Sequence, residues 1–198
     1  MPLPQEEGNY SYADYLTWPE GERWEIIDGI AYMQATPSPH HQEISGNLFV
    51  QFHHYLSGKP CKVYPAPFSV RFVKDDEKKN EDIKKVFEPD ISIVCDQAKI
   101  DSKGCNGVPD LIIEIISPSS VKMDRFTKFN SYEKAGVKEY WIVEPEGRLV
   151  SVFVLQADQR YGRPEVYSEE DKIIVSIFPD LIVDLEPVFA GIVQVKDE

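Results

Sequence analysis

The strongest hydrophobic pattern in the chain is the short run at residues 111–116, which reads LIIEII. Pro109 and Pro118 bound this run, and most of its residues are β-branched, which is typical of a strand buried on both faces. Glu114 is the acidic residue within it. A carboxylate in such a strand must be neutralised, pair with a cation or bind a metal. Glu114 is therefore a candidate functional residue.

A helix and a second strand follow this run. Pro118 and Ser119 are typical of a helix start and Gly136 of a helix end, so the sequence predicts a helix that ends near Ala135. Residues 139–143 (EYWIV) form the next predicted strand. A strand, a helix and a strand in this order predict two parallel strands joined by a right-handed crossover.

The N-terminal part begins with a predicted β-hairpin and a helix. Residues 23–27 and 30–33 flank an Asp-Gly pair, which is a strong hairpin signal. Apolar residues then recur every four positions from Ile44 to Leu56, which predicts a helix after the Pro-Ser-Pro break.

Three further strands are predicted in the middle of the chain, at residues 61–64, 68–73 and 86–94. The last of them contains a proline just before Asp90, which predicts a sheet edge or a bulge there. Residues 74–85 are mostly charged and indicate an exposed loop.

The C-terminal part predicts short antiparallel strands at residues 150–154, 165–167, 173–177 and 181–183. Together these patterns indicate an α/β fold, a mixed β-sheet flanked by helices, with additional antiparallel strands at the C-terminal end. We expect residues 10–198 to form a single domain, preceded by a flexible lead-in at residues 1–9.

Composition adds a few limits. A length of 198 residues with 42% hydrophobic content suits one domain with a substantial core. We expect no membrane association, because no apolar run approaches the roughly 20 residues of a bilayer span and the first residues lack a signal-peptide pattern. Cys61, Cys95 and Cys105 have no paired spacing, so we expect free thiols in a reduced, cytoplasmic setting.

The net charge of −13 opposes attraction to the phosphate backbone of nucleic acids. An enzyme acting on DNA would therefore need a local basic face despite this composition.

Two Pro-Asp pairs precede Glu114, and strand geometry chooses between them. Asp110 lies four residues before Glu114 on the same strand, about 13 Å away, which is too far to share one small cation. Asp90 belongs to the preceding strand and can lie beside Glu114, because paired residues on neighbouring strands are about 5 Å apart. We therefore predict Asp90 as the partner of Glu114 and Asp110 as a strand-end residue facing solvent.

Carboxylates without nearby His or Cys are hard oxygen ligands, which suit Mg²⁺, or Mn²⁺ in its place. Such a metal lowers the pKa of a bound water and neutralises charge on a phosphate. The following helix offers Lys122 and Lys128 as the cation beside the metal. We favour Lys128, because it lies one turn beyond Asp124 and one turn before Tyr132.

Two histidine pairs, His40-His41 and His53-His54, also invite a metal interpretation. Adjacent residues on a helix diverge by about 100°, so neither pair can present two imidazoles on one face. We therefore expect histidines of the first helical turn or of the surface.

Several of these segments together resemble the Uma family of bacterial restriction-endonuclease-like proteins, within the PD-(D/E)XK nuclease superfamily. The similar segments are residues 23–29 (RWEIIDG), 37–48 (PSPHHQEISGNL), 88–94 (EPDISIV), 109–120 (PDLIIEIISPSS), 124–128 (DRFTK) and 132–143 (YEKAGVKEYWIV). The resemblance covers about residues 10–190. It implies a restriction-endonuclease-like fold, magnesium-dependent hydrolysis of DNA phosphodiesters, and Asp90 and Glu114 as the acidic pair.

The resemblance also implies Glu25, in the early hairpin, as a third acidic residue of the site. The superfamily lysine is expected two residues after Glu114, where this chain has Ile116. In the family this lysine comes instead from the following helix, which matches Lys128. A homodimer is expected by analogy with nucleases that cut both strands.

Each candidate residue also has a structural interpretation. Glu114 can pair with a basic residue of the next helix, Asp90 can cap a strand end, Lys128 can pair with Asp124 on the helix surface, and Glu25 can pair with Arg23 or a neighbouring strand. For the whole chain, the alternative is a catalytically inactive nuclease-fold module acting in protein–protein interaction. A hydrolase built on Ser117 is disfavoured, because no histidine follows His54 to serve as its base.

Overall fold

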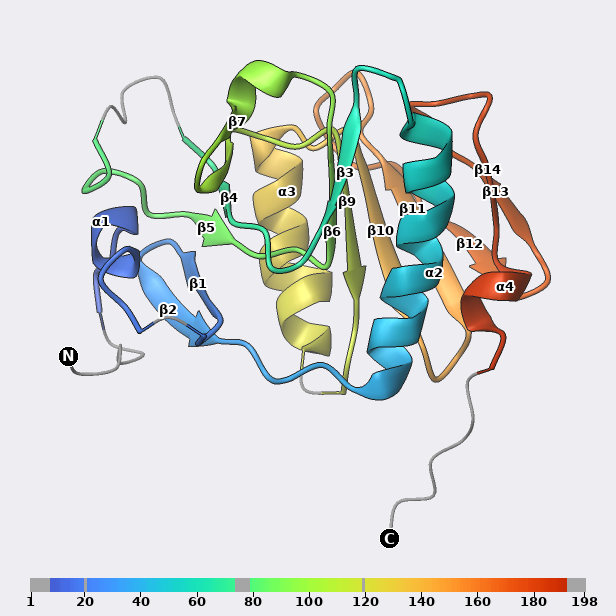
Figure 1. Cartoon of the computed structure of the whole chain (residues 1–198), viewed down its shortest axis with the longest axis horizontal. Helices are drawn as coiled ribbons and strands as arrows, with labels where there is room; N and C mark the ends of the chain where they lie inside the picture. The colour runs from blue at the N-terminus through green and yellow to red at the C-terminus, as the bar shows by residue number, and fades with distance from the viewer. Residues whose placement is uncertain (1–7, 20, 74–78, 119, 192–198) are drawn as a thin grey trace, which may run out of the picture.

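The computed structural model describes residues 8–19, 21–73, 79–118 and 120–191, and its elements are labelled in Figure 1. The strands are β1 (Trp24–Ile27), β2 (Ile30–Met33), β3 (Lys62–Pro65), β4 (Val70–Arg71), β5 (Val86–Phe87), β6 (Ile91–Val94), β7 (Ile100–Asp101), β8 (Gly104–Asn106), β9 (Leu111–Ile115), β10 (Glu139–Glu144), β11 (Leu149–Val154), β12 (Glu165–Ser168), β13 (Lys172–Ile174) and β14 (Ile182–Asp184). The helices are α1 (Tyr12–Tyr15), α2 (Pro39–Leu56), the 3₁₀ turn η1 (Gln97–Lys99), the π-helical segment η2 (Met123–Lys128), α3 (Phe129–Ala135) and α4 (Glu186–Phe189).

These strands form two six-stranded sheets and a small hairpin. The central sheet has the order β12-β11-β10-β9-β6-β3, with β9 and β10 parallel and the other neighbours antiparallel. The second sheet has the order β2-β1-β5-β4-β8-β7, and β13 pairs with β14. The mixed α/β architecture predicted from the sequence is confirmed, although the N-terminal hairpin joins a second sheet together with β4, β5, β7 and β8.

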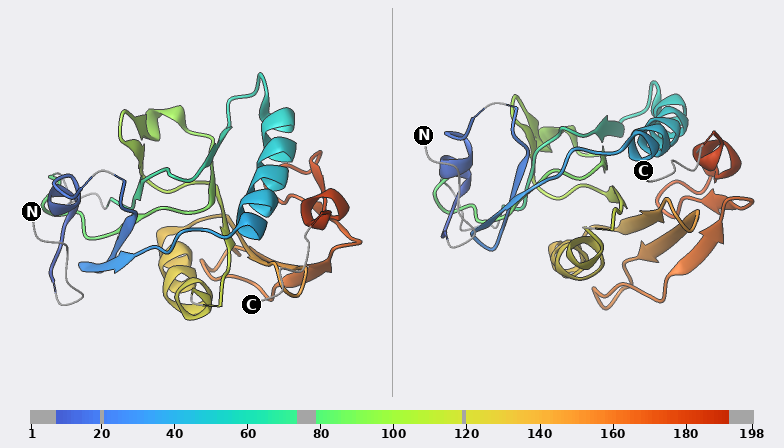
Figure 2. Two further views of the ribbon diagram at one scale, coloured as in Figure 1. Left: turned by 60° about the horizontal axis from the view of Figure 1, so that its bottom comes forward. Right: turned by 90° about the horizontal axis from the view of Figure 1, so that it is seen from below.

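Strand β9 lies between two hydrophobic layers. Leu111, Ile113 and Ile115 pack in the same core as the apolar stripe of α2. Ile112 instead packs with Tyr132 of α3 and with residues of the second sheet. Figure 2 shows α2 and α3 on opposite faces of the central sheet. Because side chains alternate along a strand, Glu114 shares the α3 face with Ile112.

The hairpin, helix α2 and the parallel crossover from β9 to β10 are confirmed. The predicted strand at residues 86–94 is wrong in one respect, because it divides into two. β5 pairs within the second sheet and β6 within the central one, so the chain changes sheets at residues 88–90. The proline there marks this change and no sheet edge, since β6 lies between β9 and β3.

The prediction of free thiols is wrong for two of the three cysteines. Cys61 and Cys95 form a disulfide, while Cys105 is a buried free thiol. β3 pairs with β6 so that Lys62 is opposite Val94, and continuing this antiparallel register by one residue brings Cys61 opposite Cys95. The pairing depends on strand register, which the spacing of cysteines in the sequence does not reveal. Because two of the three cysteines are paired, the cysteines no longer support the expected cytoplasmic location.

Within the described ranges, none of the helices has the length and apolar character needed to cross a lipid bilayer. The flexible lead-in predicted for residues 1–9 falls mostly on residues 1–7, which lie outside the described residues, as does the predicted helix cap Ser119.

Candidate active site

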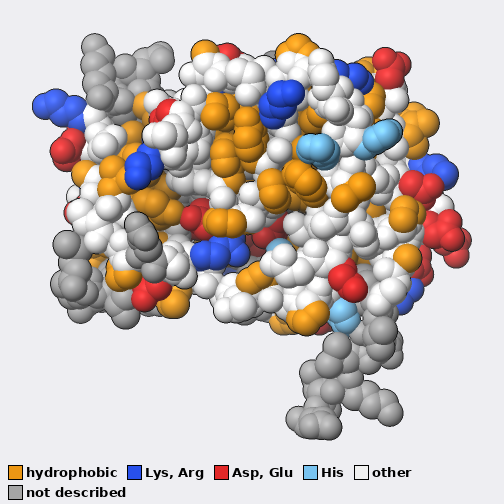
Figure 3. Space-filling model, viewed as in Figure 1, with side chains coloured by type: hydrophobic (Ala, Val, Ile, Leu, Met, Phe, Trp, Pro, Cys, Tyr) orange, Lys and Arg blue, Asp and Glu red, His pale blue; other side chains and the backbone are white. Residues whose placement is uncertain are grey.

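Four separate segments bring four carboxylates to one pocket. Glu25 comes from β1, Asp90 immediately precedes β6, Glu114 lies in β9, and Asp124 lies in η2. All four are buried, and they line a cavity of about 810 Å³ together with Lys128. In Figure 3, acidic and basic side chains lie next to each other in the region between the β1–β2 hairpin and α2.

Lys128 lies at the centre of this cluster. Its Nζ atom lies 3.1 Å from Oε1 of Glu25, 3.0 Å from Oε1 of Glu114 and 3.3 Å from Oδ1 of Asp124. The hydroxyl of Tyr132 also donates a hydrogen bond of 2.6 Å to Oε1 of Glu114. The structure thus places Glu25 and Glu114 in direct contact with Lys128, which for Glu114 is the ion pair of its structural interpretation, whereas Lys122 is exposed.

The pairing of β6 with β9 places Asp90 beside Glu114. Ile91 is opposite Ile113, so the next residue outward on β6 is level with Glu114. Oδ2 of Asp90 accepts a hydrogen bond of 2.8 Å from the backbone N–H of Ile115. Asp90 therefore also caps the strand end, which was its structural interpretation, and it faces the pocket at the same time.

Asp110 lies outside this pocket, as predicted, but it does not face solvent. Its carboxylate accepts hydrogen bonds from the backbone N–H of Cys95 and from Nζ of Lys138, and only 8% of the residue is exposed. These two partners tie the start of β9 to its neighbours and explain why Asp110 is buried.

Asp124 is the functional candidate that the sequence analysis missed. It was considered only as a surface partner of Lys128, yet both residues are buried. Segment η2 is π-helical, and the backbone N–H of Phe129 donates to the carbonyl of Asp124, five residues earlier. Such wide turns are rare and frequently occur at functional sites. The sequence signal was the i, i+4 spacing of Asp124 and Lys128, which did not indicate their burial.

Burial and like charge shape the electrostatics of the cluster. Burial raises the pKa of Glu114 well above its usual value; Lys128 opposes this shift, and Asp124, Asp90 and Glu25 add to it. Burial likewise raises the pKa of Asp124. For Lys128, burial alone would lower the pKa, but the surrounding carboxylates raise it well above the usual value. The lysine therefore stays charged, and the cluster contains more acid than it can neutralise.

Arg23 pairs with a different acid from the one considered in the sequence analysis. Its Nε atom donates to Oε2 of Glu88 at 3.1 Å. The backbone N–H of Glu88 in turn donates to Oε1 of Glu25 at 2.9 Å. Glu25 is thus oriented by a backbone donor and by Lys128, while Arg23 lines the same pocket.

His41 was expected to be a histidine of the first helical turn or of the surface. It does lie in the first turn of α2, but its Nε2 atom is 3.0 Å from Oδ2 of Asp90 and only 14% of its side chain is exposed. A surface position is therefore wrong for His41. The sequence signal was the Pro-Ser-Pro segment, which sets where the helix begins.

The donor chemistry of the cluster fits a hard divalent cation. Three carboxylates contact one ammonium group and Asp90 lines the same pocket, and carboxylate oxygens are the ligands that Mg²⁺ and Mn²⁺ prefer. In the described part of the chain, no three acidic, imidazole or thiol groups already converge on a point where a metal could bind. Lys128 instead contacts three of the acids, and Asp90 is the one that it does not contact.

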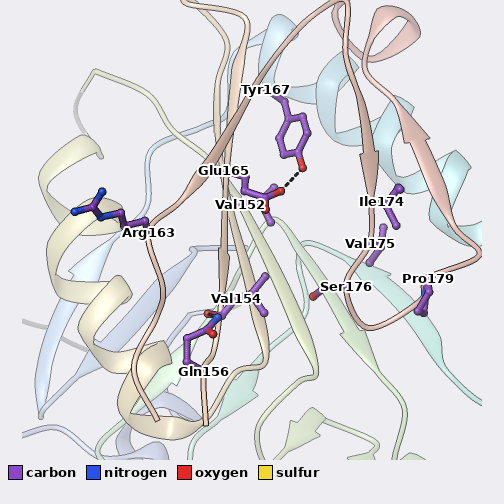
Figure 4. A pocket seen from close by; sticks show the side chains of 10 residues that line it. All are labelled: Val152, Val154, Gln156, Arg163, Glu165, Tyr167, Ile174, Val175, Ser176 and Pro179. Carbon is purple, nitrogen blue, oxygen red and sulfur yellow. Dashed lines mark hydrogen bonds between the residues drawn. The ribbon is translucent and has the colours of Figure 1, made fainter. Parts of the chain in front are cut away.

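A second cavity, of about 390 Å³, lies between β11, β12 and the segment around β13 (Figure 4). Its lining is mostly apolar, and the hydroxyl of Tyr167 donates to Glu165 within it. This arrangement offers one acid already occupied by a tyrosine, so it lacks the excess of carboxylates found in the first pocket.

A solved structure shows a similar fold. A protein of Anabaena variabilis ATCC 29413, described as "a putative nuclease belonging to DUF820", matches with a TM-score of 0.70 and 19% sequence identity, covering 91% of this chain and 97% of that chain. The chain therefore has the nuclease-like α/β fold that the resemblance implied. It belongs to the Uma2 family, because the model of that family, described as "Putative restriction endonuclease", matches residues 12–186.

A curated relative gives no activity. The protein slr1290 of Synechocystis sp. (strain ATCC 27184 / PCC 6803 / Kazusa), described as uncharacterized, is 30% identical over 121 residues. The match covers 60% of this chain and 60% of that relative, so the chain spans less than two thirds of the relative's length.

Proposed function

We propose that the chain is a metal-dependent endonuclease that hydrolyses DNA phosphodiester bonds in the pocket around Glu114. The observation that carries this proposal is the excess of buried acid. Glu25, Asp90, Glu114 and Asp124 face a single buried ammonium group in a cavity that opens to solvent. Buried ion pairs are costly, and perturbed groups of this kind gather at functional sites. Membership of the Uma2 family supports the same conclusion.

In this proposal Asp90 and Glu114, with Glu25, hold Mg²⁺, or Mn²⁺ in its place. The bound ion supplies Lewis-acid activation of a water molecule and neutralises charge on the scissile phosphate. Lys128 is held by three carboxylates and keeps its proton, so it acts as a fixed cation beside the attacking water and the scissile phosphate. The hydroxyl of Tyr132 fixes the Glu114 carboxylate.

The charge of the pocket affects how strongly DNA can bind there. Arg23 and Lys128 are the basic residues among the described residues that line it, and Glu144 and Glu146 add further acid. The guanidinium of Arg23 is held by Glu88 and is 25% exposed, which suits a contact with a phosphate beside the scissile one. We therefore expect DNA binding to be weak without the divalent ion and to be sensitive to salt.

The test is cleavage of supercoiled, linear duplex and single-stranded DNA with Mg²⁺ or Mn²⁺, by the wild-type chain and by Glu114→Gln. We expect the wild-type chain to cut and the variant to be inactive, with chelation abolishing cleavage. Equal cleavage by both proteins would overturn the assignment of the active site to the pocket around Glu114. No cleavage by either across the three substrates would overturn the proposal.

The second candidate is a non-enzymatic interaction module with the same fold. The position of Lys128 favours it, because the ammonium already neutralises part of the acid that a metal would serve. Calorimetric titration with Mn²⁺ separates the two candidates, since a module has no metal binding that depends on Asp90. We also keep as proposals a single domain over residues 10–198 and a homodimer, which sedimentation analysis would test.

A further inference from the structure

The first turn of α2 places His41 against the pocket in a fixed position. Ser38 is the N-cap residue, and its side chain accepts a hydrogen bond of 3.2 Å from the backbone N–H of His41. Pro39 occupies the first helical position, where its fixed φ suits the start of a helix. The backbone that carries the imidazole is therefore defined by two local signals.

The contacts of the imidazole indicate which of its nitrogens carries the proton. Nε2 lies 3.0 Å from Oδ2 of Asp90, while the buried Nδ1 has no hydrogen-bond partner among the described residues. A buried N–H group without an acceptor costs about 1–3 kcal/mol. The neutral tautomer with its hydrogen on Nε2 leaves only an acceptor unpaired at Nδ1 and places a donor 3.0 Å from Oδ2 of Asp90.

Both contacts of the Asp90 carboxylate fall on the same oxygen. Oδ2 faces Nε2 of His41 at 3.0 Å and accepts the backbone N–H of Ile115 at 2.8 Å. The hydrogen bond from Ile115 and the contact with the imidazole therefore both restrain Oδ2. Among the described residues, Oδ1 takes part in neither contact, and Asp90 lines the pocket. The carboxylate is therefore fixed in orientation with one oxygen to spare.

We propose that His41 is a positioning residue that holds Asp90 so that Oδ1 is presented to the divalent cation. The inference rests on the metal site of the proposed function, but it does not require that DNA be the substrate. Groups that hydrogen-bond to a metal ligand fix its orientation, and their loss typically weakens metal affinity about 10–100-fold. In this proposal His41 acts on the metal site through Asp90 and does not itself bind the metal.

The test is calorimetric titration of Mn²⁺ into the full chain and three variants. His41→Gln keeps an N–H donor at about the reach of Nε2, whereas His41→Asn is polar but too short. His54→Asn, on the exposed last turn of the same helix, is the matched control. We expect His41→Asn to weaken the Mn²⁺ affinity about 10–100-fold. His41→Gln and His54→Asn should stay within about threefold of the wild-type chain, well short of that loss.

Each outcome decides a specific point. If His41→Asn folds, as judged by its thermal midpoint, and binds Mn²⁺ like the wild-type chain, the positioning role is overturned while the proposed nuclease stands. If His41→Gln binds as weakly as His41→Asn, N–H donation is not what matters, and the role is again overturned. If affinity depends on His41 but no DNA is cleaved, the inference stands and the proposed function fails. A wild-type chain that binds no Mn²⁺ overturns both.

A spectroscopic measurement gives a check without metal. Nitrogen-15 NMR of the imidazoles in the metal-free chain, at a pH where histidine is neutral, should show His41 protonated at Nε2. Protonation at Nδ1 would overturn the proposed contact, because Nε2 would then have no hydrogen to direct at Asp90. His54→Asn again serves as the control for signal assignment.

Discussion

Glu114 and Glu139 are two buried glutamates on neighbouring strands, and their surroundings differ. Glu114 lies in β9 opposite Ile142, and Glu139 lies in β10 opposite Leu111. Glu114 is 3% exposed and Glu139 is fully buried. Side-chain alternation places Glu114 on the α3 face of the sheet and Glu139 on the α2 face.

The partners of the two glutamates account for the difference. Glu139 accepts hydrogen bonds from three neutral donors, namely the indole of Trp141, the hydroxyl of Ser176 and the backbone N–H of Ile177. Glu114 instead shares one lysine with two other acids and lines the larger pocket. We therefore propose a functional role for the carboxylate that like charges surround, and a structural role for the one that neutral donors satisfy.

Removing Lys128 should have the largest effect, a loss in the free energy of unfolding. Lys128→Met leaves Glu25, Glu114 and Asp124 without their cation, and loss of one partner of a buried ion pair costs about 3–5 kcal/mol. We expect urea unfolding with a chelator to show this loss, and Mn²⁺ to restore part of it. Lys138→Met is the control, because its ammonium is 64% exposed and pairs with Asp110, so it should cost less than about 1 kcal/mol. Equal stabilities of the two variants would contradict the central position of Lys128.

Glu139→Ala should destabilise the chain by about 3 kcal/mol, because buried donors are left without an acceptor. The cleavage rate per folded molecule should not change, since Glu139 does not line the pocket. Urea unfolding and DNA cleavage, measured on the same preparation, provide the check. A variant of normal stability would show that neutral donors do not require this carboxylate.

Glu114→Gln should show the opposite pattern. The amide oxygen can still accept from Tyr132 and Lys128, and one negative charge is removed from a cluster with too many. We expect stability to be unchanged or higher in metal-free buffer. Cleavage should fall by more than about 100-fold, which corresponds to about 2.7 kcal/mol in the barrier. A large loss of stability instead would assign Glu114 the same structural role as Glu139.

The smallest expected effect concerns Glu133 on α3, an acid outside the pocket. The backbone N–H of Tyr161 and then Arg160 hold the pKa of Glu133 below its usual value of 4.5. A lowered folded-state pKa gives stability that is present above the unfolded value and lost as the pH falls through the folded value. Glu133→Gln should therefore cost about 1 kcal/mol at pH 7 and nothing at strongly acidic pH. Urea unfolding at both pH values measures this, and a cost that persists in acid would contradict it.

Much of the fold follows from local sequence patterns. The β-branched run at residues 111–116, the Asp-Gly hairpin and the Gly136 helix end act over a few residues, and each appears where predicted. The choice of Asp90 over Asp110 needed only strand spacing, and the structure places Asp90 at the pocket. The roles of Asp90 and Glu114 in catalysis stay predictions.

Other features depend on contacts between distant segments. The disulfide requires the register of β3 against β6, and the division of residues 86–94 requires a second sheet to receive β5. The burial of Asp124 requires the π-helical segment to pack against Tyr140, whose hydroxyl donates to the Asp124 carbonyl at 3.1 Å. The contact of His41 with Asp90 likewise joins residues 49 positions apart. No local pattern carries this information.

The wide turn of η2 also constrains how the chain can change in length. Arg125 and Phe126 are exposed, so their identities can vary without disturbing the acids below. Their number can fall by one only if the wide turn is lost, because a π-helical turn holds about one residue more than an α-helical turn. The hydrogen bond from the backbone N–H of Phe129 to the carbonyl of Asp124 would be lost with it. In related chains, gaps between the positions of Asp124 and Lys128 should therefore be far rarer than substitutions.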